Sequence, residues 1–111
     1  MSTELLQRRA SPLPAGTPAL AQSDVKNLLT QIPAWEAVEG HHLRRQYKFA
    51  DFAGALRWVN RIGAIAEAEQ HHPDIELGWG RVVVTTYTHS VGGLSINDFI
   101  LAAKIDAAPA D

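Results

Sequence analysis

Apolar residues in the middle of the chain recur three or four positions apart, which is the spacing of one face of an α-helix. The positions are Phe52, Leu56, Val59, Gly63 and Ala66, with Ala55 and Ile62 beside them. Asp51 precedes this run and is a suitable N-cap, and Pro73 follows it. Because the residue before a proline avoids the α region, the pattern predicts an amphipathic helix that starts after Asp51 and ends before Pro73.

Alternating apolar and polar residues lie on both sides of this helix and predict strands. Upstream, "WEAVEG" (35–40) and "HLRRQYKFA" (42–50) are expected to pair as a hairpin that turns near Gly40. Downstream, "DIELGWGRVVVTTYTHS" (74–90) predicts a short strand, a turn around Trp79 and a longer strand that carries His89. Strands joined by such short turns run antiparallel.

Two further helices complete the predicted order. Ser23 or Asp24 is the expected cap of a short helix before the first strand, and Ser95 starts the last helix. The order helix, two strands, helix, two strands, helix predicts an α+β domain, with a four-stranded antiparallel sheet and helices packed on one face. We place this domain at residues 22–107.

Residues 1–21 differ from the rest of the chain in composition. The stretch "SPLPAGTPAL" (11–20) holds three prolines and one glycine, which favour turns and extended chain over a packed element. This segment is therefore expected to be a flexible, proline-rich arm outside the domain.

Composition narrows the classes of function. The chain has 111 residues, the size of a single domain, and its 10 Lys and Arg against 12 Asp and Glu leave a net charge of −2, without the basic excess of a nucleic-acid-binding protein. It holds no cysteine, which excludes disulfides and thiolate metal sites. No apolar run approaches the roughly 20 residues that cross a bilayer. We therefore expect a cytoplasmic protein that binds neither nucleic acid nor membrane.

Three histidines are the clearest candidates for chemistry, because imidazole titrates nearest to neutrality. His71 and His72 stand immediately before Pro73, and His89 lies on the predicted strand that follows. The pattern leaves three interpretations open. The histidines form a metal site, they act as acids and bases, or they end a helix and interact only with its dipole.

A metal site is the weakest of these interpretations. His71, His72, His89 and Asp74 supply enough donors for zinc, but adjacent residues face apart both on a helix and on a strand. The spacings HxxxH and HExxH are absent. Acid–base catalysis does not require the two adjacent side chains to bind one ion. An imidazole also needs only a small change in its pKa to move a proton near pH 7. Glu67, four residues before His71, is expected to lie one helical turn away and to orient it.

These residues, with others around them, resemble the signature of the pterin-4a-carbinolamine dehydratases. The matching positions are Glu67, His71, His72, Pro73, Asp74, Trp79, Thr88, His89, Gly93, Leu94, Ser95 and Asp98. The framework also resembles the family, from Leu28 and Trp35 to "DFILAAKID" (98–106). The resemblance extends over roughly residues 20–106 and is far more specific than one short motif.

The resemblance implies a hydro-lyase that dehydrates 4a-hydroxytetrahydropterin to quinonoid dihydropterin in tetrahydropterin recycling. It assigns catalysis to His71, His72 and His89. The residues that it assigns to substrate binding or support are Glu67, Pro73, Asp74, Trp79, Thr88 and Asp98. It also implies the α+β fold, no cofactor, no metal, and assembly as a homodimer or homotetramer.

Some alternatives remain open from the sequence. Relatives with this fold include protein-binding and assembly factors, for example for rubisco in carboxysome bacteria, so a non-catalytic role with a protein partner is the alternative function. Asp98 also fits the S-x-x-D pattern of a helix start, which makes it either a cap or a member of the site. Trp79 is either a substrate contact or part of the turn packing, and packing is favoured.

Overall fold

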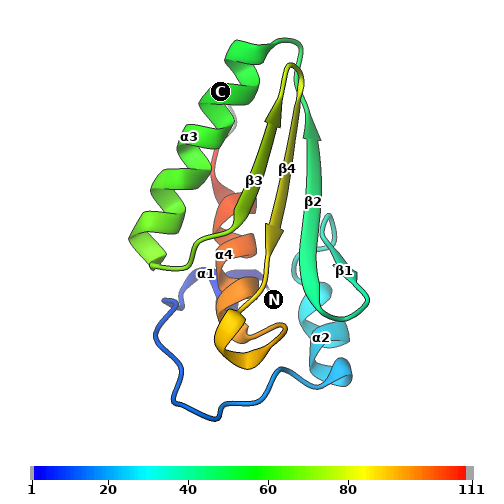
Figure 1. Ribbon diagram of the computed structural model, residues 1–111, viewed down its shortest axis with the longest axis vertical. Coiled ribbons are helices and arrows are strands. Elements are labelled where there is room, and N and C mark those ends of the chain that lie inside the picture. The colour runs from blue at the N-terminus through cyan, green and yellow to red at the C-terminus, as the bar shows by residue number, and fades with distance from the viewer. Residues whose placement is uncertain (1, 110–111) are drawn as a thin grey trace.

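The computed structural model describes residues 2–109 and has the α+β fold that the sequence predicts (Figure 1). Four antiparallel strands form one sheet in the order β1-β2-β4-β3. The strands are β1 (Glu36–Val38), β2 (His42–Lys48), β3 (Asp74–Gly78) and β4 (Arg81–Thr86). The helices are α1 (Ser2–Leu6), α2 (Gln22–Leu29), α3 (Phe52–Glu69) and α4 (Ile96–Ala107), and a 3₁₀ turn, η1, spans His89–Val91. Both α3 and α4 pack against the same face of the sheet (Figure 1).

Strand β4 lies inside the sheet, between β2 and β3. Its residues Val82, Val84 and Thr86 share one face and are buried. Both predicted hairpins are confirmed, and the first turns at Glu39 and Gly40, whose φ angles of 53° and 66° are left-handed. Strand β4 therefore runs from an exposed turn through the core and leaves the sheet beside α4, where η1 begins (Figure 1).

Helix α3 starts and ends as predicted. The Asp51 side chain accepts a hydrogen bond from Gly54 N at 2.8 Å, and the helix stops at Gln70, which has the left-handed φ of 54°. The prediction of its buried face is wrong in part, because Phe52 and Leu56 are 44% and 40% exposed. The buried residues are Ala55, Trp58, Ile62, Ala66 and Glu69. The apolar residues of this helix cover a wider arc than the surface that packs against the rest of the protein. Periodicity alone therefore centred the predicted buried face too close to Phe52 and Leu56.

Helix α2 starts earlier than predicted. Its N-cap is Ala21, which makes no side-chain cap, so the expectation that Ser23 or Asp24 caps the helix is wrong. Asp24 instead lies in the first turn, where a carboxylate interacts favourably with the helix dipole. The buried residue of this helix is Val25.

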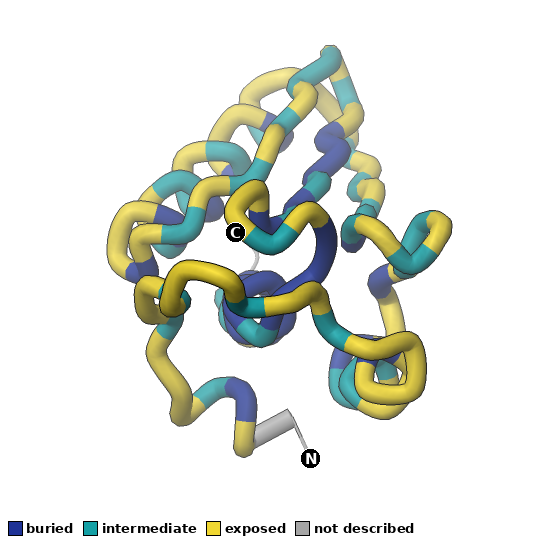
Figure 2. Tube along the Cα trace, turned by 60° about the horizontal axis from the view of Figure 1, so that its bottom comes forward, coloured by how far each residue is buried: buried dark blue, intermediate teal, exposed yellow. Residues whose placement is uncertain are grey.

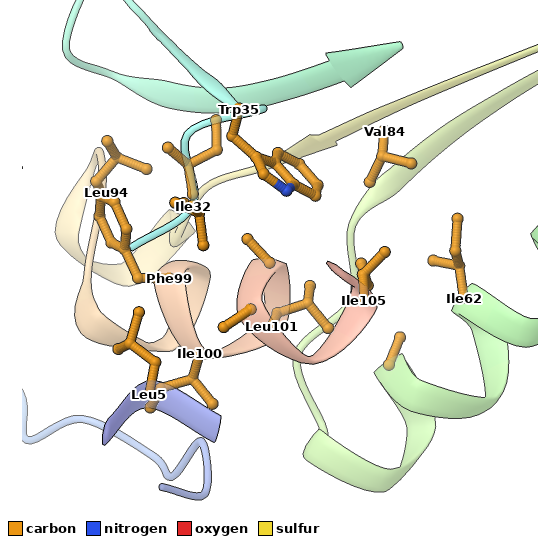
Figure 3. Packing of buried hydrophobic residues seen from close by; sticks show 14 of the residues in the cluster. Leu5, Ile32, Trp35, Ile62, Val84, Leu94, Phe99, Ile100, Leu101 and Ile105 are labelled. Carbon is orange, nitrogen blue, oxygen red and sulfur yellow. The ribbon is translucent and has the colours of Figure 1, made fainter. Parts of the chain in front are cut away.

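The N-terminal segment carries a helix that the sequence does not predict. Helix α1 packs against α4, and Leu5 is only 1% exposed (Figure 3). Burying a leucine side chain contributes about 1.5–3 kcal/mol towards holding this short helix against α4. Residues 11–20 form no helix or strand, as their composition predicts, and the packed helix lies before them.

Helix α4 forms the centre of the core. Seven consecutive residues from Asn97 to Ala103 are buried, because the sheet, α3 and α1 surround the helix (Figures 2 and 3). Its N-cap is Ser95, as predicted, and a capping box links Ser95 to Asp98. Among the residues described, no helix has both the length and the apolar character needed to cross a membrane.

Candidate active site

The imidazole of His71 contacts a buried carboxylate. Its Nε2 lies 2.6 Å from Asp98 Oδ1, and the two side chains are 12% and 0% exposed. The left-handed Gln70 turns the chain at the end of α3, and His71 N donates to Ala66 O at 3.2 Å. Because an ionised carboxylate only accepts hydrogen bonds, this contact places the proton of a neutral His71 on Nε2 and leaves Nδ1 as the basic nitrogen.

Asp98 is both a helix cap and a member of the site. Besides His71, its Oδ1 accepts from Thr86 Oγ1 at 2.7 Å. Its Oδ2 accepts from Thr88 Oγ1 at 2.8 Å and from Ser95 N at 3.0 Å. The carboxylate thus accepts four hydrogen bonds, as a buried charge requires. Asp98 therefore caps α4, as one of the two alternatives predicts, and the same side chain contacts His71.

The second histidine of the pair has a different partner. His72 Nε2 lies 2.5 Å from Glu67 Oε2, and the two side chains are 56% and 73% exposed. The expectation that Glu67 orients His71 is therefore wrong. The chain reverses at Gln70, so His71 turns inward towards α4 and His72 comes to lie over the last turn of α3. The two adjacent histidines are each oriented by a carboxylate, one buried and one exposed.

His89 does not lie on a strand, so that prediction is wrong. Strand β4 ends at Thr86, and His89 is the first residue of η1. Its ring packs against Tyr87, with 4.4 Å between the ring centroids and an angle of 45° between their planes. The side chain of His89 is exposed at this end of the molecule.

A cavity of about 290 Å³ adjoins His71. It is lined by residues 10–13, residues 69–71, Thr88, Ser90 and Asn97. Of the predicted site residues, His71 and Thr88 contribute to its wall, and Thr88 and Ser90 are the two neighbours of His89 in the chain. The contribution of residues 10–13 was missed by the sequence reasoning, because a proline-rich stretch carries no periodic signal that would place it in the fold.

The remaining predicted site residues lie further along the β3–β4 hairpin. Pro73 precedes β3 and Asp74 begins it, opposite Thr85 on β4. Trp79 lies in the turn at the other end of the hairpin from the histidine pair and is 70% exposed (Figure 1). The favoured expectation that Trp79 packs into the turn is wrong, and within one chain it lies away from His71.

Two of the three candidate histidines, His71 and His72, are each paired with a carboxylate. Within residues 2–109, no group of three or more His, Cys, Asp or Glu side chains is arranged to hold a metal ion.

One more buried carboxylate lies at the cavity wall. Glu69 accepts from Lys104 Nζ at 2.7 Å and from Ala10 N at 2.9 Å. Burial alone would raise the pKa of Glu69, but these two hydrogen bonds and the charges of Lys104 and Arg9 outweigh it and lower the pKa below its ordinary value.

The sheet, the helix arrangement and the histidine–carboxylate pairs define a small α+β protein with a cavity beside His71 at one end. The family described as pterin 4 alpha carbinolamine dehydratase matches residues 18–108. A protein of Rubrobacter xylanophilus, provisionally named as a pterin-4-alpha-carbinolamine dehydratase, is 45% identical over 94% of this chain and 97% of its own length. The chain belongs to this family, as its resemblance to the family signature indicated.

Two solved structures resemble the fold. The crystal structure of a transcriptional coactivator/pterin dehydratase from Brucella melitensis is 32% identical, has a TM-score of 0.74 and covers 80% of this chain and 96% of its own. A pterin dehydratase-like protein identified as a rubisco assembly factor in the α-carboxysome is 22% identical, has a TM-score of 0.51 and covers 60% of this chain and 76% of its own. At this identity the second likeness is one of fold alone.

Proposed function

We propose that this protein dehydrates a 4a-hydroxytetrahydropterin to the quinonoid dihydropterin. Family membership supports the substrate class, and the hydrogen bond between His71 and the buried Asp98 is the single observation that supports acid–base chemistry best. A carboxylate that fixes the tautomer and the orientation of an imidazole is a recurrent arrangement in general acid–base catalysis. The cavity of about 290 Å³ beside His71 is at the small end of the range for ligand pockets, about 300–1,000 Å³.

The reaction requires two proton transfers. The leaving hydroxyl at C4a takes up a proton and departs as water when the C4a–O bond breaks. The adjacent ring nitrogen loses a proton, and its electron pair forms the new C=N bond. One proton is supplied and one is removed, so the reaction is proton-neutral overall. The base, now protonated, returns a proton to the acid directly or through solvent, which restores both groups, and each contributes about 10²–10⁴-fold.

Three histidines are candidates for these transfers. His71 has Nδ1 available because Nε2 is held by Asp98, and we assign it substrate positioning and proton transfer. His72, held by Glu67, and His89, at the start of η1, are assigned the main acid and base roles. Glu67, Asp98 and Thr88 support them through hydrogen bonds. Pro73 and Asp74 fix the start of β3 behind the histidine pair.

The test is the dehydration of 4a-hydroxytetrahydropterin generated in situ and followed by ultraviolet absorbance. The wild-type protein should accelerate the reaction. Each of the variants His71→Ala, His72→Ala and His89→Ala should lose most of that acceleration. His42→Ala, which removes a histidine of the β1–β2 hairpin, is the matched control and should retain it. A folded wild-type protein that does not accelerate the reaction would refute the proposal and favour a protein-binding role.

A further inference from the structure

The N-terminal segment from Arg9 to Leu20 is attached to the folded domain at both ends. At one end, Arg9 Nη2 donates to Ala68 O at 3.2 Å, next to the end of α3. At the other end, Leu20 N donates to Leu94 O at 2.9 Å, just before α4. Between these points the chain passes across the end of the molecule where β4 leaves the sheet (Figures 1 and 2). The segment therefore runs beside η1 and the histidine pair rather than away from them.

Two buried polar side chains hold the segment at the cavity. Asn97 is 6% exposed, and its side chain bonds the backbone of Ser11 twice, accepting from Ser11 N at 3.2 Å and donating to Ser11 O at 2.8 Å. Glu69 is also 6% exposed and accepts from Ala10 N at 2.9 Å. Buried polar groups are costly unless they are paired, so each of these side chains fixes the backbone that satisfies it.

The segment held in this way is a wall of the cavity next to His71. Residues 10–13 line it together with His71, Thr88 and Ser90. Pro12 and the half-buried Leu13 are the apolar part of this wall. The family match begins at residue 18, so these residues lie outside the region that defines the family.

We infer that residues 10–13 are a substrate-binding wall of the pterin site, positioned by Asn97 and Glu69. This inference rests on the proposed function and adds to it the residues that enclose the substrate. A planar, partly apolar ring held against His71 Nδ1 needs an opposing surface, and in the described chain Pro12 and Leu13 provide an apolar one. The wall contributes no proton donor or acceptor to the reaction, so it affects binding of the substrate more than the chemical step.

The experiment compares three variants with the wild type. Leu13→Ala trims the wall itself, and Asn97→Ala removes both hydrogen bonds to Ser11. Leu28→Ala is the matched control, because Leu28 is also half-buried but packs at α2, outside the cavity. The measurements are kcat and KM for dehydration, and the Kd of 7,8-dihydrobiopterin, which lacks the 4a-hydroxyl and does not react.

Leu13→Ala and Asn97→Ala should raise both KM and Kd by roughly tenfold, the effect of losing about one contact of 1.4 kcal/mol, and leave kcat nearly unchanged. Leu28→Ala should change neither constant. Hydrogen exchange gives a second readout that does not depend on turnover. The amides of Ala10 and Ser11, which bond Glu69 and Asn97, should exchange more slowly when 7,8-dihydrobiopterin is bound.

The two hypotheses fail in different ways. If the wild type dehydrates the substrate and binds 7,8-dihydrobiopterin, but Leu13→Ala and Asn97→Ala behave like Leu28→Ala, the proposed function stands. The inference that residues 10–13 bind the substrate is then overturned. The same conclusion follows if binding leaves the exchange of Ala10 and Ser11 unchanged. If the wild type neither binds 7,8-dihydrobiopterin nor dehydrates the substrate, both are overturned.

Discussion

His71 and Asp98 are 27 residues apart in the sequence, and His71 Nε2 lies 2.6 Å from Asp98 Oδ1 at the start of α4. The carboxylate that orients this imidazole also caps α4 through Ser95 N. The position of the candidate catalytic group is therefore coupled to the start of the most buried helix. A change at Asp98 must affect stability and the site together, because the same four hydrogen bonds serve both.

Asp98→Asn should test this coupling. The amide replaces one acceptor oxygen by a donor, so two of the four donors around it lose their partner, each at about 1–3 kcal/mol. We expect a loss of stability of about 2–4 kcal/mol, seen as a lower urea midpoint at constant slope, and a fall in kcat of about 10²-fold. Thr86→Val is the control, because it removes one hydrogen bond and keeps the charge. It should be destabilised less and stay active. A wild-type urea midpoint for Asp98→Asn would contradict the role of the carboxylate.

Tyr47 provides a pH-dependent test of the core. Burial raises its pKa to about 12, although the positive charge of Arg45 acts in the opposite direction. Because the pKa of Tyr47 is higher in the folded than in the unfolded chain, where it is about 10, the neutral phenol stabilises the folded state. This stabilisation is complete below pH 10 and is lost as the pH rises towards 12, by roughly 2–3 kcal/mol in total. In Tyr87→Phe, where Tyr47 is the remaining tyrosine, the tyrosinate absorbance should rise near pH 12. A rise with its midpoint near pH 10 in the folded protein would show that the hydroxyl is not buried.

The exposed apolar residues of α3 bear on the expected homo-oligomer. Phe52 and Leu56 lie one turn apart and are 44% and 40% exposed. Large apolar side chains that share an exposed helix face are typical of an interface. We expect Leu56→Asp to lower the mass measured by sedimentation equilibrium, because it places a charge where apolar surface would be buried. Ala64→Asp adds the same charge at an exposed position two turns further along the same helix and should leave the mass unchanged. A monomeric wild type would refute the expectation of a homodimer or homotetramer.

The sequence predicts the elements that carry a strong local signal. Asp51, the turn at Gly40 and the cap at Ser95 are such signals, because each acts on backbone groups within a few residues. Long-range partners leave no such signal. Nothing near His71 in the sequence indicates that Gln70 adopts a left-handed conformation and directs the imidazole to Asp98 instead of Glu67.

The N-terminal segment illustrates the same limit. Helix α1 has five residues, too few for an apolar period to be visible, and its Leu5 becomes buried only because α4 lies beside it. The proline-rich residues that follow have no pattern of their own. Their position depends on Asn97 and Glu69, which come from two distant helices. Sequence reasoning therefore identified the candidate histidines and missed residues 10–13, which line the cavity beside His71.

Glu67 offers a test that separates chemistry from stability. Its contact with His72 is exposed on both sides, and surface ion pairs contribute about 0–1 kcal/mol, so Glu67→Gln should leave the urea midpoint nearly unchanged. If the carboxylate fixes the tautomer of His72 for proton transfer, the same variant should lower kcat by about tenfold and leave KM unchanged.

Glu76→Gln is the matched control for Glu67→Gln. Glu76 is also an exposed carboxylate, paired with Arg81 at 3.5 Å on the β3–β4 hairpin and outside the cavity, so its loss should affect neither kcat nor KM. Equal kcat values for Glu67→Gln and wild type would show that His72 needs no oriented tautomer. The acid–base work would then fall to His71, whose partner Asp98 is buried, and to His89. A parallel fall in kcat/KM for both variants would instead indicate a general effect of surface charge on substrate capture, which added salt should abolish.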